Sequence, residues 1–140
     1  MILLTDLYSK YYIIHNIKPN ESKPIFSVIH ILYVQNYGIA FNIFDVYYEK
    51  LYYIFMVLFL IFIYIYFKKL TYTNNIAYIF IFSGGISNII NRLYYGFIID
   101  FIDIKINNYS IIIFNFADLI IIIGIVTILC NFQIFEQFKK

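Results

Sequence analysis

Long uncharged apolar runs, separated by short polar segments, dominate this chain. Residues 51–67, 70–91 and 119–135 contain no charged side chain. At 1.5 Å per helical residue, the first run extends about 25 Å, which is close to the thickness of a bilayer hydrocarbon core. The N-terminal segment is a weaker candidate, because it carries Asp6 and Lys10, which can pair on one helix face. The pattern predicts a mainly α membrane protein, one domain over residues 1–140, with four transmembrane helices near residues 1–17, 50–67, 74–92 and 113–133.

Two connecting segments carry the alternating and turn-forming residues of β structure. Residues 25–33 are rich in β-branched and aromatic side chains and follow a polar, turn-rich piece at residues 18–24. Residues 104–106 and 110–113 flank Asn107-Asn108, which is a hairpin signal. We therefore expect a small β element on the outer face of the membrane domain.

Composition supports a membrane location and excludes several kinds of partner. Hydrophobic residues make up 63% of the chain and charged residues 13%, whereas soluble domains have about 25% charged residues. The net charge of +2 comes without a basic stripe, so we expect no nucleic-acid partner. His15 and His30 lack metal-ligand spacing, and the single Cys130 allows no internal disulfide. We expect no metal and no cofactor.

The density of basic residues sets the expected orientation. Lys68 and Lys69 fall in one short connection, and Lys139 and Lys140 form the C-terminal tail. Short segments that are rich in lysine stay in the cytoplasm. We therefore expect a multi-pass protein with both termini cytoplasmic.

Two aspartates in apolar surroundings are the candidate chemistry. A carboxylate at a membrane helix centre costs about 2.5 to 3.5 kcal/mol, so Asp100 and Asp118 suggest a functional site. On the expected topology, both gather near the outer membrane boundary with polar side chains of the third and fourth helices, namely Asn88, Arg92 and Asn115. Two carboxylates close together cannot easily both ionise, so one keeps a proton and the other acts as a base. Such a pair can activate water against a peptide carbonyl.

Five short motifs resemble those of one enzyme family, in family order and over nearly the whole chain. They are Asp-x-x-x-Lys at residues 6–10, Asn-x-Gly-x-Ala-Phe at 36–41, a glycine-rich box at 84–92, Gly-x-x-x-Asp-Phe at 96–101 and Phe-Asn-x-Ala-Asp at 114–118. The family is lipoprotein signal peptidase, also called signal peptidase II.

The resemblance implies an aspartic endopeptidase of the bacterial inner membrane. It would remove the signal peptide from a prolipoprotein, on the N-terminal side of the diacylglyceryl cysteine, and would act as a monomer among membrane lipids. Asp100 and Asp118 would be the catalytic pair. The resemblance gives substrate-binding or site-ordering roles to five further residues, which are Asn36, Asn88, Arg92, Asn115 and Asp6.

The chain also departs from the family pattern at two positions. Asn91 replaces the aspartate of the usual Asp-Arg pair, which removes a charge that could orient Arg92, and Ser87 replaces a usual glycine, which adds bulk. A degenerate, non-catalytic relative that binds prolipoproteins or acts as a membrane scaffold is therefore the alternative function. A small ion-coupled carrier is a third, although the chain shows no internal repeat.

Several other residues have structural interpretations. Asp6 and Lys10 can form a structural ion pair or support the site from the first helix. Asp103 is expected to be a solvated charge. Gly84-Gly85 is expected to let another helix approach closely.

Overall fold

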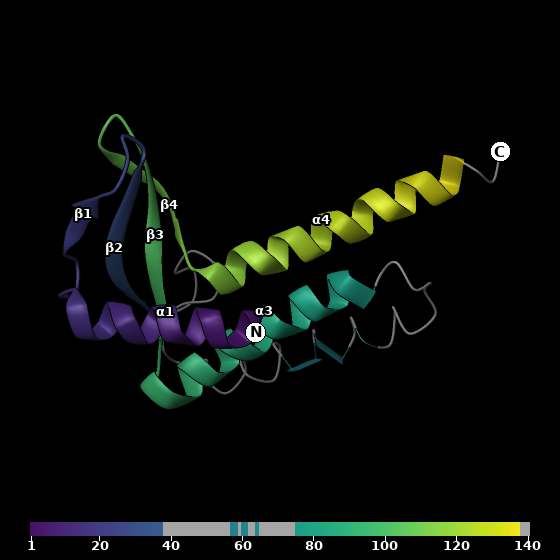
Figure 1. Ribbon diagram of the computed structural model, residues 1–140, viewed down its shortest axis with the longest axis horizontal. Helices are drawn as coiled ribbons and strands as arrows, with labels where there is room; N and C mark the ends of the chain where they lie inside the picture. The colour runs from purple at the N-terminus through teal and green to yellow at the C-terminus, as the bar shows by residue number, and fades with distance from the viewer. Residues whose placement is uncertain (38–56, 59, 62–63, 65–74, 138–140) are drawn as a thin grey trace.

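Three helices and four strands are described in the computed structural model, which covers residues 1–37, 57–58, 60–61, 64 and 75–137. Figure 1 shows their arrangement, with the sheet at one end and two long helices extending from it. In chain order the elements are α1 (Ile2–Asn16), β1 (Ser22–Pro24), β2 (Ile29–Asn36), α3 (Asn75–Tyr95), β3 (Ile98–Ile106), β4 (Tyr109–Phe114) and α4 (Phe116–Gln137).

The four strands form one antiparallel sheet in the order β1-β2-β3-β4. Asn107 and Asn108 join β3 to β4, and both have positive φ angles, 51° and 66°. A two-residue type I′ turn requires positive φ at both central residues, and asparagine tolerates it. The hairpin expected around these asparagines is therefore confirmed.

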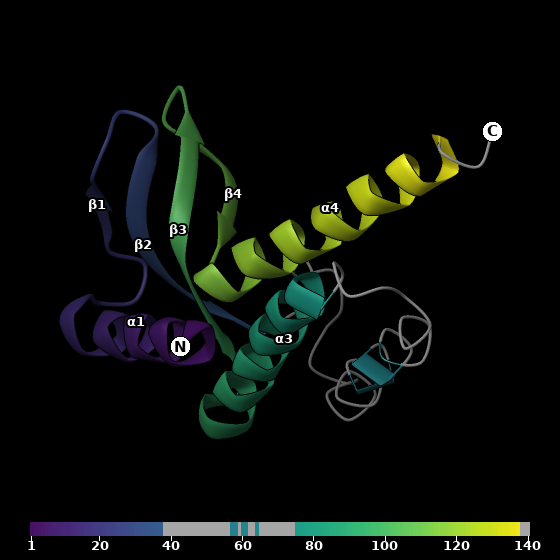
Figure 2. The same ribbon diagram turned by 45° about the vertical axis from the view of Figure 1, so that its right-hand side comes forward.

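Helix α1 packs across one end of the sheet. Ile13 of α1 lies in a buried cluster with Tyr33 of β2 and with Ile99 and Phe101 of β3. Figures 1 and 2 show α1 beneath the strands from both directions. The buried polar residues of α1, Asp6 and Lys10, contact α3 and the start of α4 instead.

Helices α3 and α4 lie side by side where glycines remove the side chains between them. A Cβ on Gly84 would lie 2.5 Å from the Ala117 carbonyl oxygen, and one on Gly124 would lie 2.7 Å from the Ala77 carbonyl oxygen. The two helices therefore approach nearly backbone to backbone, as the sequence predicted for Gly84. Figure 2 shows α3 running downward past the lower end of the strands and α4 running away from the sheet.

The prediction of four transmembrane helices is wrong. Among the described residues, only Ile76–Tyr95 in α3 is long and apolar enough to cross a membrane. Helix α1 has 15 residues and buries Asp6 and Lys10 inside the protein, and the apolar part of α4 with described side chains is Phe116–Cys130. The helix expected at residues 50–67 lies mostly outside the described residues. The expected small β element is instead a four-stranded sheet that carries Asp100.

Gly84→Ala should destabilise the protein, whereas Gly85→Ala should not. Alanine at position 84 pushes its methyl group against the backbone of α4, and such overpacking costs about 1 to 3 kcal/mol. At position 85 the nearest atom is the flexible end of the Leu60 side chain, at 3.1 Å. Thermal unfolding of the detergent-solubilised protein measures both variants. Equal unfolding midpoints would contradict the close approach of α3 and α4.

Candidate active site

Asp118 is positioned by the way in which α4 begins. The backbone N–H of Asp118 donates to Asn115 Oδ1 at 3.0 Å, and the backbone N–H of Asn115 donates to Asp118 Oδ2 at 3.2 Å. This reciprocal pair is a capping box, which satisfies free N–H groups at a helix start. The local sequence Asn-Phe-Ala-Asp therefore fixes the first turn of α4 and the Asp118 carboxylate with it.

Asp100 is positioned by the register of the sheet. Asp100 lies in β3 opposite Val34 of β2, and only 5% of its surface is exposed. Asn36, two residues beyond Val34, donates its side-chain N–H to Asp100 Oδ2 at 2.8 Å. Asn115 donates its side-chain N–H to Asp100 Oδ1 at 2.7 Å. Asn115 therefore contacts both aspartates, Asp100 through its side chain and Asp118 through its cap.

Asn88 of α3 holds the other side of Asp118. Its Nδ2 donates to Asp118 Oδ1 at 2.8 Å, while its Oδ1 accepts from Lys10 Nζ at 2.7 Å. Lys10 also pairs with Asp6 on α1, with Nζ 2.7 Å from Oδ2. A continuous chain of polar contacts thus leads from α1 through α3 to Asp118.

The Asp6 carboxylate connects three helices. Ser87 of α3 donates its hydroxyl to Asp6 Oδ2 at 2.6 Å, and the backbone N–H of Ala117 in α4 donates to Asp6 Oδ1 at 2.8 Å. Ser87 is completely buried. The bulk that serine adds here is therefore accommodated with a hydrogen bond.

Arg92 and Asn91 hold the backbone around the site. Arg92 Nη2 donates to the backbone carbonyl of Tyr37, just after β2. Asn91 accepts the backbone N–H of Ile99 at 2.8 Å, so its amide anchors the start of β3, beside Asp100. A neutral amide oxygen is sufficient for this contact.

The structure therefore gathers six of the seven candidate residues into connected contacts: Asp100, Asp118, Asn36, Asn88, Asn115 and Asp6. Arg92 is connected to them indirectly, because it donates to the backbone carbonyl of Tyr37, the residue that follows Asn36. Ser87 was not assigned to the site from the sequence, and Lys10 was considered only as the ion-pair partner of Asp6. The spacing of Lys10 from Asp6 was visible, but its contact with a residue 78 positions away was not.

The expectation that Asp103 is solvated is wrong. Asp103 is completely buried, accepts a hydrogen bond from Ser110 at 3.0 Å, and lies 3.5 Å from Lys105 Nζ. Alternation along β3 places it on the same face as Ile99 and Phe101, which belong to the buried cluster with α1. Asp100 projects to the opposite face.

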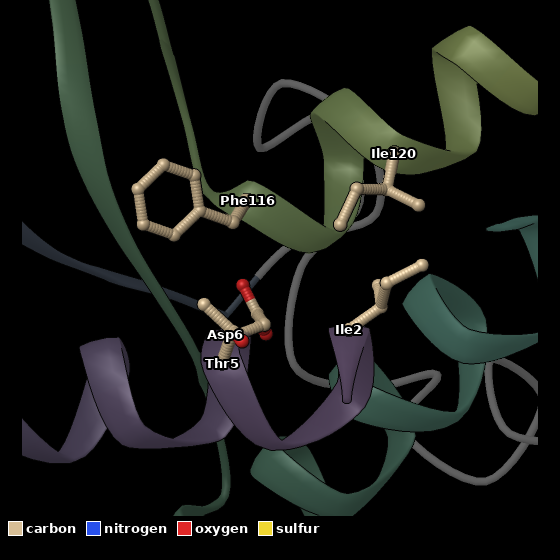
Figure 3. A pocket seen from close by; sticks show the side chains of 5 residues that line it. All are labelled: Ile2, Thr5, Asp6, Phe116 and Ile120. Atoms are coloured by element: carbon tan, nitrogen blue, oxygen red, sulfur yellow. The ribbon is translucent and has the colours of Figure 1, made fainter.

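A small apolar pocket of about 200 Å³ lies between the starts of α1 and α4. Figure 3 shows its lining side chains, which are Ile2, Thr5, Asp6, Phe116 and Ile120. It borders Asp6 and does not include the two aspartates of the site. Among the described residues, no group of three His, Cys, Asp or Glu side chains is arranged to hold a metal ion.

Comparison with known proteins identifies the family. The family model described as Signal peptidase (SPase) II matches residues 1–134. The chain belongs to the signal peptidase II family.

Two relatives and one solved structure show how far this similarity extends. A lipoprotein signal peptidase of Buchnera aphidicola subsp. Baizongia pistaciae is 43% identical, over 88% of this chain and 80% of that protein. One from Pasteurella multocida is 35% identical, over 98% and 84%. A structure described as a bacterial membrane enzyme, solved by the in meso method, superimposes with a TM-score of 0.88 at 27% identity and covers 99% of this chain and 87% of the other. The chain is therefore a protease of the signal peptidase II type, and it shares its fold with a bacterial membrane enzyme.

The electrostatics around the two aspartates favour the protonated form of Asp100. Burial, followed by the negative charge of Asp118, raises the pKa of Asp100 to about 6. The hydrogen bonds from Asn36 and Asn115 and the charge of Lys10 oppose this rise. Asp100 therefore keeps a proton at a pH where an exposed aspartate has lost it.

Asp100→Asn should remove a pH-dependent loss of stability. Because the pKa of Asp100 is raised in the folded state, the stability that this group contributes is complete below about pH 4 and is lost as the pH rises through about 6. A pKa change from 3.8 to about 6 corresponds to about 3 kcal/mol. Thermal unfolding at several pH values should show the wild type losing stability relative to the variant between pH 4 and pH 7. Parallel pH dependences would contradict the raised pKa.

Proposed function

We propose that this protein is an aspartic endopeptidase of the bacterial inner membrane, with Asp100 and Asp118 as its catalytic residues. It removes the signal peptide from prolipoproteins on the N-terminal side of the diacylglyceryl cysteine. The observation that carries the proposal is the contact of Asn115 with both aspartates. Membership of the signal peptidase II family supplies the substrate class.

The reaction follows from a pair that shares one proton. The ionised carboxylate takes a proton from water, and the water oxygen forms a bond to the scissile carbonyl carbon. The protonated carboxyl donates its proton toward the carbonyl oxygen, which stabilises the developing charge. The tetrahedral carbon then breaks its bond to nitrogen. The leaving amine takes the proton that the first carboxylate removed from water, and a hydroxyl proton of the intermediate returns to the second carboxylate, which restores the pair. The raised pKa of Asp100, about 6, supports a protonated partner in mildly acidic conditions, where an exposed aspartate is already ionised.

The neighbouring polar residues order this pair. Asn36 and Asn115 hold Asp100, while Asn88 and Asn115 hold Asp118. We assign Asp6 a supporting role through Lys10, and Arg92 a role in holding the segment after Asn36. Amide donors offset the burial of a carboxylate without adding positive charge, so they leave one proton on the pair.

The proposed setting is one membrane domain over residues 1–140, acting as a monomer with both termini in the cytoplasm. Asn88 and Arg92 lie near the end of α3, and Asp118 lies in the first turn of α4, so the site is at one end of these two helices. A lipid-anchored cysteine in the outer leaflet would hold its scissile bond at that level. The non-catalytic alternative is less well supported, because Ser87 and Asn91, the two departures from the family pattern, both make buried hydrogen bonds.

Asp100→Asn and Asp118→Asn should each abolish cleavage while the protein stays folded in the membrane. Asparagine keeps the size of aspartate and can still form hydrogen bonds, but it cannot act as a general base or share the proton. We expect activity to fall on the order of 10³-fold or more. The assay is the gel shift of a diacylglyceryl prolipoprotein incubated with purified enzyme.

Asp103→Asn is the matched control, because it changes an aspartate on the opposite face of the same strand. Its activity per folded molecule should stay within about twofold of the wild type, since the acid lies outside the polar network of the site. Full cleavage by either of the first two variants would refute the mechanism.

Cysteine labelling tests the proposed orientation. In a Cys130→Ser background, a cysteine replacing Asn20 should react with a membrane-impermeant maleimide from the outside. A cysteine replacing Lys69, which lies outside the described residues, should react only after permeabilisation. The reason is that basic residues in short segments stay cytoplasmic. Labelling of both positions from the same side would overturn the orientation.

A further inference from the structure

Lys10 is a completely buried lysine with two polar contacts. Only 1% of the Lys10 surface is exposed, and its Nζ lies 2.7 Å from Asp6 Oδ2 and 2.7 Å from Asn88 Oδ1. Lysine is almost never fully buried unless it is paired. The ion pair with Asp6 explains the charge, but it does not explain the second contact, which points toward the site.

The second contact determines how the Asn88 amide is turned. A lysine ammonium has three donors and no acceptor, so only the oxygen of Asn88 can face it. The NH₂ group of Asn88 must then face the other way, where Nδ2 lies 2.8 Å from Asp118 Oδ1. Turning the amide over would set donor against donor at Lys10 and oxygen against carboxylate at Asp118.

We propose that Lys10 is a positioning residue of this site, which acts through Asn88 to keep an N–H donor on Asp118. The meaning of this donor for catalysis rests on the proposed function, because it favours the ionised form of Asp118 that the reaction needs. Asp6 pairs with Lys10 and holds it in place. The Asp6 carboxylate does not depend on Lys10 alone, because it also accepts hydrogen bonds from Ser87 and Ala117.

The test compares four variants: Lys10→Met, Lys10→Arg, the double variant Asp6→Asn/Lys10→Met, and Lys23→Met. Methionine matches the length of lysine without a donor, and arginine keeps a donor-only cation. The double variant avoids leaving the Asp6 charge buried without its cation, which by itself could prevent folding. Lys23→Met is the control, because Lys23 pairs with Glu21 on the exposed strand β1.

For Lys10→Met and the double variant, kcat should fall on the order of 10- to 100-fold, the range seen when a residue that orients a catalytic group is lost. KM should stay within about twofold, since Lys10 is buried and has almost no exposed surface that a substrate could contact. Lys10→Arg should keep more activity than Lys10→Met, and Lys23→Met should match the wild type. If the lysine is only a structural counter-ion, folded yield falls while kcat per folded molecule in the double variant is unchanged.

The pH–rate profile separates positioning from folding. The charged groups that meet here are Asp6 and Lys10 on α1, Arg92 on α3, Asp100 on β3 and Asp118 on α4. Loss of the donor and of the Lys10 charge makes the aspartate pair harder to ionise, so the acid limb of kcat/KM should move to higher pH. An unchanged profile in a folded Lys10 variant would overturn the proposal.

A spectroscopic measurement tests the same contact without catalysis. The side-chain amide resonances of Asn88 in the ¹⁵N-labelled, detergent-solubilised wild type should shift as the aspartates titrate. That response should be lost in the folded double variant and kept in Lys23→Met. If Asp118→Asn still cleaves but the Asn88 response depends on Lys10, the proposed function fails and the positioning role stands. If Asp118→Asn is inactive but the Asn88 response survives without Lys10, the positioning role fails alone.

Discussion

The buried charge of Asp6 constrains the rest of this structure. A carboxylate at 1% exposure is tolerable only if its oxygens are paired, and here the partners come from three helices. Lys10 comes from α1, Ser87 from α3 and the backbone N–H of Ala117 from α4. Satisfying one charge therefore fixes the relative positions of these helices. Because Ala117 directly precedes Asp118, the same interaction fixes where Asp118 lies relative to α1 and α3.

The two aspartates are held by local and long-range interactions that meet at Asn115. Its backbone and its side-chain oxygen complete the capping box with Asp118, and its remaining amide group reaches Asp100 in the sheet. A helix start and a strand are thus joined by one side chain. A shift of either element by one residue would break one of these contacts, which explains how a short motif can define a site made from distant elements.

The choice of asparagine around the carboxylates has an electrostatic reason. Asn36, Asn88 and Asn115 donate to the pair at 2.7 to 2.8 Å without adding charge. Arginine at such positions would favour ionisation of both acids. The cations are instead one step removed, with Lys10 behind Asn88 and Arg92 on the Tyr37 carbonyl. The raised pKa of Asp100 is consistent with this balance.

The sequence alone determined the features that depend on near neighbours. Asn107-Asn108 predicted the hairpin, and Gly84 predicted a close helix contact. The three-residue spacing of Asn115 and Asp118 is also that of the capping box found at the start of α4. Apolarity alone overstated the number of spanning helices, because α1 has only 15 residues and buries Asp6 and Lys10, and the described apolar stretch of α4 is Phe116–Cys130. Only the tertiary structure decided that Asp103 is buried, that Asn36 reaches Asp100, and that Lys10 turns Asn88. These contacts depend on sheet register and helix packing between residues far apart in the chain, which no local pattern encodes.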